Sequence, residues 1–178
     1  MSNEDELFRD GPGILSPPEG RRGFRNYPVT PVFLADEKSG RIDRDFEIDT
    51  GYWLITEKMK AVFEQVDPQA FAFLKCDTKL RDGTDGPRHW LCDVVRVLDA
   101  LDEEKSTIKI ETADSGRKIY NLFGRRSLIF NPDVVGQYHV FRMRYSESIV
   151  ICDDELMHAC KADRTTGMSF KDAVEGAI

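Results

Sequence analysis

The sequence predicts an α+β fold: a single β-rich domain with a mainly antiparallel sheet and two or three short helices. Three observations lead to this class. Apolar and polar residues alternate over residues 107–112 and again over 140–145, which is the period of a half-buried strand. Segments rich in glycine, proline and aspartate separate the apolar runs. Helical spacing is confined to a few short segments, so strands dominate the prediction.

Composition limits the class of protein. The chain has 178 residues, of which 40 % are apolar, including eleven phenylalanines and two tryptophans. This content is enough for the core of one domain. The net charge is -7, which disfavours non-specific binding to nucleic acid and to anionic membranes. An acidic balance suits a basic partner, although a charge of this size also serves solubility alone.

The N-terminal residues differ in composition from the rest. Residues 1–26 are rich in glycine and proline, which predicts an extended or flexible arm, followed by a single domain over 27–178. The first ten residues are acidic and lack the apolar core of a secretion signal. No apolar run reaches the roughly 18 residues that a membrane span needs. These features predict a cytoplasmic protein.

The first half of the chain contains strand and helix signals in turn. Residues 32–35 follow two prolines and predict an edge strand, and residues 38–40 predict a turn. Residues 52–55 predict a short strand. Thr56 is placed to cap a helix that runs to about Val66 and ends before Asp67-Pro68. The apolar face of this helix is expected to consist of Met59, Val62, Phe63 and Val66.

The middle of the chain is ambiguous. Residues 71–74 predict a strand and residues 82–87 a turn. Over residues 88–101 the apolar residues fit a helical stripe, whereas the β-branched valines favour a strand. We predict a strand near residues 89–92, followed by a helix or helical turn over about 94–101.

The second half begins with a hairpin. Residues 107–112 and 118–123 flank Ser115-Gly116, which predicts a β-hairpin, and 127–130 predict another strand. In the strand over 140–145, Phe141, Met143 and Tyr145 are expected to face inward, and Arg142 and Arg144 outward. The remaining elements are predicted as a buried strand over 149–151, a helix from about 153 to 162 with acids in its first turn, and a last short strand over 168–170.

Cysteines and histidines supply no recognised catalytic or metal pattern. Cys76, Cys92, Cys152 and Cys160 form no C-x-x-C pair and are expected to be buried, reduced thiols. The pairs His89/Cys92 and His158/Cys160 do not match a standard zinc spacing. Sets of a cysteine, a histidine and an aspartate arise readily by chance in this composition. We therefore predict no catalytic residue, no metal and no cofactor.

Two acidic clusters are the candidate partner-binding residues. The first comprises Asp99, Asp102, Glu103 and Glu104, and the second Asp153, Asp154 and Glu155. Helix N-capping alone accounts for the second cluster, and a solvated loop accounts equally well for the first. At an interface, such carboxylates would pair with lysine and arginine of a basic partner and would speed association.

Four blocks carry a resemblance to a known family. They are residues 52–57, 66–73, 90–104 and 134–143. Together they resemble a family of immunity proteins that bacteria encode beside polymorphic toxins. This family is well represented in myxobacteria and other proteobacteria and was first catalogued as a domain of unknown function. The resemblance extends from about Arg44 to Ala173 and leaves residues 1–40 outside. It implies a cytosolic, non-catalytic protein that binds and blocks a cognate toxin, often a nuclease, and it assigns no functional residue.

Two other classes remain open from the sequence. One is a small enzyme that uses Cys92 or Cys152 with a histidine. The other is a scaffold protein that self-associates through an edge strand, so that a homo-oligomer is not excluded. Loss of an activity on Cys→Ser substitution would favour the enzyme, and a stable homo-oligomer would favour the scaffold.

Overall fold

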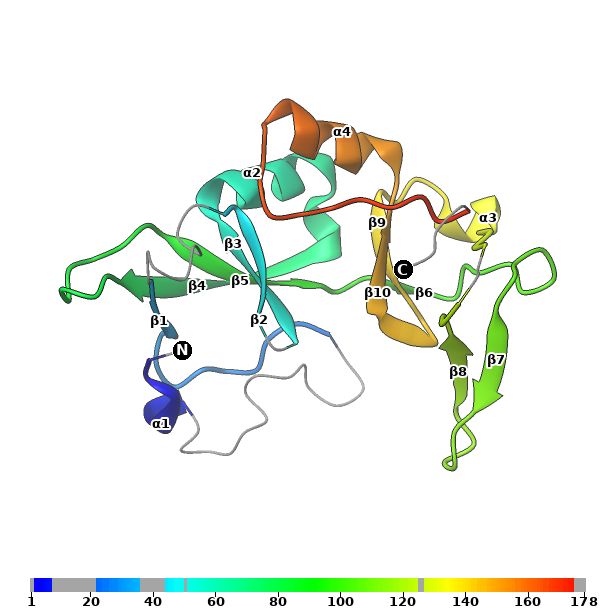
Figure 1. The fold of residues 1–178 in the computed structure, drawn as a ribbon, viewed down its shortest axis with the longest axis horizontal. Coiled ribbons are helices and arrows are strands. Elements are labelled where there is room, and N and C mark those ends of the chain that lie inside the picture. Colours follow the sequence, from blue (N-terminus) through cyan, green and yellow to red (C-terminus); the bar gives the residue numbers. More distant parts are fainter. Residues whose placement is uncertain (1, 8–21, 36–43, 50, 125–126, 175–178) are drawn as a thin grey trace.

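The computed structural model describes residues 2–7, 22–35, 44–49, 51–124 and 127–174, and it confirms the α+β class (Figure 1). A five-stranded sheet has the order β1-β4-β5-β3-β2 and is antiparallel except between β1 and β4. A three-stranded sheet has the order β10-β9-β6, and β7 pairs with β8 alone. The strands are β1 (Val32–Leu34), β2 (Phe46–Asp49), β3 (Tyr52–Thr56), β4 (Phe71–Lys79), β5 (His89–Val94), β6 (Val97–Leu98), β7 (Lys109–Thr112), β8 (Lys118–Asn121), β9 (Val140–Met143) and β10 (Ser146–Cys152).

The helices are short. They are α1 (Glu4–Leu7), α2 (Glu57–Val66), α3 (Pro132–Val135) and α4 (Asp154–Ala162), with a 3-10 turn, η4, over Pro68–Ala70. The prediction for α2 is confirmed: the Thr56 hydroxyl accepts the Met59 N–H at 3.3 Å, and Pro68 begins the next turn. The buried side chains of α2 are Met59, Val62 and Phe63, which belong to the expected apolar face.

The largest core lies between the five-stranded sheet and the two longer helices. Figure 1 shows α2 and α4 on the same side of this sheet. The rings of Phe63 from α2 and Phe71 from β4 stack with centroids 4.4 Å apart. Leu156 and Cys160 of α4 belong to the same cluster. Burial of these faces is what holds such short helices, because isolated helices of this length are marginal in water.

The described residues form two smaller cores besides this one. On the other face of the five-stranded sheet, Phe33, Tyr52, Cys76 and Leu91 pack with the partly buried Phe24. A third core joins the three-stranded sheet to the β7–β8 hairpin, and its buried members are Leu101, Tyr120, Leu128 and Met143. The alternation of side chains along β5 explains the division, since neighbouring residues in a strand face opposite sides of the sheet.

The helix predicted over residues 94–101 is wrong. β5 extends to Val94, and the Val95 N–H donates to the Ala70 carbonyl at 2.7 Å. β6 then pairs in parallel with β9. The β-branched valines predicted the observed strands correctly, whereas the helical spacing did not. Both β5 and β6 pair with strands that are distant in sequence, and this pairing decides the conformation.

Arg142 does not face outward as predicted. Only 4 % of it is exposed, and all four residues of β9 are buried. Its Nε donates to the Val94 carbonyl at 3.0 Å, and its Nη1 donates to the Glu147 carbonyl at 2.7 Å. The outer face of β9 is covered by the end of β5, so the alternation of polar and apolar residues does not mark a solvent-facing side here.

The remaining differences lie at short elements. Residues 168–170 are irregular rather than a strand, and residues 127–130 form only two isolated bridges, Thr107↔Ser127 and Leu101↔Phe130. β2, α3 and the single turn α1 were not predicted. The turn expected at residues 38–40 lies outside the described residues. The hairpin prediction is confirmed, since β7 and β8 are antiparallel around Gly116, whose φ of 78° suits glycine.

Candidate functional site

The first acidic cluster occupies the loop between β6 and β7, and two of its members hold that loop together. Asp102 Oδ1 accepts the Lys105 N–H at 3.1 Å, and its Oδ2 lies 2.6 Å from Lys105 Nζ. Lys105 also lowers the pKa of Asp102. Glu103 accepts hydrogen bonds from Lys118 and from the Tyr120 hydroxyl, the latter at 2.6 Å. Both residues therefore have a structural role that the sequence analysis did not assign to them.

Asp99 and Glu104 differ from their neighbours. Both are exposed, and neither makes a hydrogen bond or an ion pair with the side chains of the described residues. Their local effect is through space: Asp99 helps to raise the pKa of Lys118, and Glu104 helps to raise that of Lys105. These two residues are the members of the first cluster that remain available to a partner.

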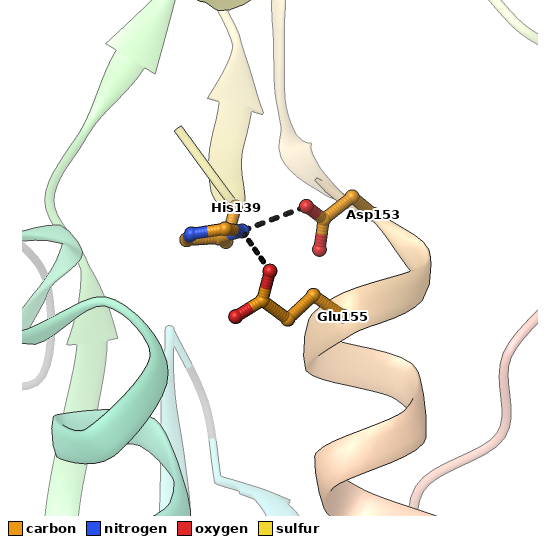
Figure 2. Close-up of side chains that lie close together, drawn as sticks. All are labelled: His139, Asp153 and Glu155. Atoms are coloured by element: carbon orange, nitrogen blue, oxygen red, sulfur yellow. Dashed lines mark hydrogen bonds and ion pairs between the residues drawn. The ribbon is translucent and has the colours of Figure 1, made fainter. Parts of the chain in front are cut away.

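The second cluster stands at the start of α4. Asp153 is the N-cap, and its Oδ1 accepts the Leu156 N–H at 3.1 Å, as helix capping predicts. Its Oδ2 lies 2.7 Å from Nδ1 of His139, and Figure 2 shows Glu155 reaching the same nitrogen from one side. Glu155 Oε2 is 3.7 Å from that nitrogen. Asp154 is exposed, and its side chain makes no hydrogen bond or ion pair within the described part of the chain.

His139, Asp153 and Glu155 could between them offer three ligand atoms to a divalent cation, since these atoms lie within 4.8 Å of one another. The local chemistry favours a protonated histidine instead. A helix N-terminus carries partial positive charge, which disfavours a divalent cation more strongly than a singly charged imidazolium. One oxygen of Asp153 is already occupied by the helix cap. We therefore interpret the group as a histidine ion pair.

The His139 ion pair is expected to make stability depend on pH. Its hydrogen bond with Asp153 raises the pKa of His139. The stabilisation is complete below the unfolded-state pKa of about 6.5 and is lost as the pH rises through the higher folded-state value. Between about pH 6 and about pH 9, urea unfolding should show a larger loss of stability for the wild type than for His139→Gln. If the free energy of unfolding changed with pH equally in the two proteins, the His139 ion pair would not be the cause.

The two clusters lie at opposite ends of β9. Leu98, just before the first cluster, pairs with Met143 at the end of β9. The Asp153 N–H donates to the carbonyl of His139, which directly precedes β9. The intervening strand separates the clusters by roughly 15 Å. A single interface of ordinary size is wide enough to span that distance, although the clusters do not merge into one patch.

A buried charge network was missed by the sequence analysis. Asp93 on β5 is 0 % exposed, and its carboxylate accepts the Gly23 N–H at 2.7 Å and hydrogen bonds from Arg22 and Arg142. It thereby ties the N-terminal segment and β9 to the five-stranded sheet. The available signal was an aspartate inside an apolar strand, which must find compensating partners.

A second, largely buried ion pair lies where β9 begins. Arg96, between β5 and β6, donates to both oxygens of Asp67 at the end of α2. Asp67 Oδ2 also accepts the His139 N–H at 3.2 Å. The guanidinium of Arg96 lies 4.0 Å from the ring centroid of Tyr138. The contact to Asp67 therefore fixes the point where β9 begins, beside the second acidic cluster.

The cysteines do not have the setting of a nucleophile. In the structure all four are free thiols. Burial raises the pKa of Cys92 well above its usual value and raises that of Cys152 to about 12. A catalytic cysteine needs a lowered pKa and an accessible, electropositive environment. Neither residue proposed for the alternative enzyme meets these conditions.

Comparison with known proteins defines the class. The chain matches the model of the Immunity protein family (Imm11) over residues 1–175. Because this match covers nearly the whole chain, the protein belongs to that family, which confirms the resemblance and extends it to the N-terminal residues. No curated protein matches the chain. Membership implies a role in toxin immunity with a toxin as the partner, and such families are typically non-catalytic. Within the described residues, no helix is long and apolar enough to cross a membrane.

Proposed function

We propose that this protein neutralises a cognate toxin by binding it directly and covering its active site or an adjacent surface. Membership of an immunity protein family carries the proposal. The exposed acids Asp99, Glu104 and Asp154 support it, because their carboxylates make no hydrogen bond or ion pair within the described chain. A toxin with a basic surface, such as a nuclease, would be attracted to them.

The acids contribute to such binding unequally. Asp102, Glu103 and Asp153 are already engaged in the loop contacts and the helix cap, so a partner would have to compete for them. Asp99, Glu104 and Asp154 can bind a partner without first breaking a contact within the described part of the chain. Charges at the margin of an interface mainly speed association and select the partner, whereas buried apolar contacts provide most of the affinity. A tight complex would bury on the order of 1,600 Å² in total.

The proposal places the protein in the cytoplasm of the cell that it protects. The four free thiols support a reducing compartment, since disulfides form and persist mainly in oxidising ones. Binding there would intercept a toxin after it enters the cell. Neither a cofactor nor nucleic acid takes part in the proposed mechanism.

Co-expression with the product of the adjacent toxin gene tests the proposal. The toxin alone is expected to arrest growth, and this protein is expected to restore growth and to co-purify with the toxin. An unrelated toxin serves as the control for specificity and should not be neutralised. Continued arrest in the presence of folded, abundant protein, together with no co-purification, would argue against direct neutralisation of that toxin.

A further inference from the structure

One edge of β7 has no backbone partner within the described ranges. The hairpin closes with the Ala113 N–H donating to the Arg117 carbonyl at 2.9 Å, and Glu111 lies opposite Ile119. Hydrogen bonding alternates along an antiparallel pair. Counting back by twos from Ala113, Glu111 and Lys109 therefore turn their amide groups toward β8. The residues that turn them away from β8 are Ile108, Ile110 and Thr112.

The unpaired edge lies on the outside of the molecule. Figure 1 shows the hairpin at one end, with β8 between β7 and β10. The other edge of β8 is occupied, because the Tyr120 N–H donates to the Tyr145 carbonyl at 3.0 Å. Ile110, in the middle of β7, is 44 % exposed although it is a large apolar residue. An exposed strand edge of this kind is a template for pairing with another strand.

The residues along this edge are complementary to themselves. If two copies of β7 pair antiparallel with Ile110 on the two-fold axis, Lys109 of each copy lies opposite Glu111 of the other. Ile108 lies opposite Thr112 in the same register. This register also matches the outward amide groups, so that each copy donates and accepts at residues 108, 110 and 112. An axis at Ile108 or at Thr112 would leave both charges without a cross-strand partner.

We propose that β7 is a self-association surface that joins two copies of this chain through a two-fold, antiparallel β7–β7 contact centred on Ile110. The two hairpins then form one four-stranded sheet, in which each β7 gains a backbone partner on its second edge. Lys109 Nζ and Glu111 Oε1 are now 2.6 Å apart within one chain, and they would exchange this pair for two equivalent cross-strand pairs. The proposal is independent of the toxin.

The edge is short, so the expected dimer is weak. Three outward residues per copy allow up to six backbone hydrogen bonds around a small apolar centre. Such an interface is at the small end of known interfaces, below about 1,200 Å² in total. We expect a dissociation constant on the order of 10 µM, which sedimentation equilibrium of the full chain can measure.

Ile110→Lys is the direct test. It places two like charges face to face on the axis and should weaken dimerisation about tenfold or more. Ile48→Lys is the matched control, because Ile48 is 75 % exposed on β2, an edge strand of the five-stranded sheet. This control should dimerise like the wild type. A wild type that is monomeric up to about 200 µM, or equal weakening by both substitutions, would overturn the proposal.

A charge swap tests the register. Lys109→Glu alone should weaken the dimer by opposing Glu111 of the second copy, and the double variant Lys109→Glu/Glu111→Lys should restore it. Thermal unfolding of each variant separates this effect from damage to the hairpin. Failure of the double variant to restore dimerisation, with its fold intact, would exclude this register. A monomeric wild type whose toxin binding is abolished by Ile110→Lys would instead assign the edge to a strand of the toxin.

Discussion

Replacing Asp93 by alanine is expected to lower the free energy of unfolding by roughly 3–5 kcal/mol, the largest effect that we predict for a single substitution. The carboxylate is fully buried and accepts hydrogen bonds from Arg22, Gly23 and Arg142. Its removal leaves Arg142 buried beside Arg22, and the remaining carboxylate, Glu147, lies 3.8 Å from Arg22. Burial and Arg22 already lower the pKa of Arg142, whereas Asp93 opposes that shift. Urea unfolding measures the loss.

Two further variants make the Asp93 result specific. Asp93→Asn removes the charge and replaces one of the two acceptor oxygens by an NH2 group, but it keeps the other acceptor, so it should lose less stability than the alanine variant. Asp99→Ala removes an exposed carboxylate that makes no hydrogen bond or ion pair with the described residues, and it should change stability by no more than about 0.5 kcal/mol. A loss below about 1 kcal/mol for Asp93→Ala would mean that this network does not hold the two sheets together.

The sequence predicted the elements whose causes are local. Thr56 and Asp153 cap the helices that follow them, and both were recognised because a cap acts within three residues of its own position. The β7–β8 hairpin was recognised for the same reason, since its turn around Gly116 lies between two alternating segments. Each of these signals is contained in a few consecutive residues.

The errors arose where a distant partner decides the outcome. Residues 94–101 form no helix because β6 pairs with β9, more than forty residues later in the chain. Arg142 is buried because it donates a hydrogen bond to the buried carboxylate of Asp93 on β5. The two residues are far apart in the sequence, and no local pattern predicts that they pair. The same reason limited the candidate site. Lys118 of the hairpin binds Glu103, so that acid has a structural role that its own cluster did not suggest.

Reversing the three unpaired acids is expected to slow association with the toxin about tenfold or more at low salt. The variant Asp99→Lys/Glu104→Lys/Asp154→Lys changes the charge by two at each position, from a net -7 to -1. Because these side chains make no hydrogen bond or ion pair with other described residues, the fold should tolerate the change. Stopped-flow or surface-based kinetics should show most of the effect in the association rate, and added salt should reduce the difference by screening.

The control must carry the same net charge at another place. Asp5, Glu6 and Asp77 are exposed acids on α1 and β4, and Figure 1 shows these elements at the other end of the molecule from β6 and β7. Reversing these three residues also brings the net charge to -1. If long-range attraction alone governs binding, both variants slow association equally. If the acids beside β9 face the toxin, only their reversal has the full effect, because the local potential decays over about 10 Å. The opposite result, with slower association only for the α1 and β4 variant, would move the toxin-binding surface to that end of the protein.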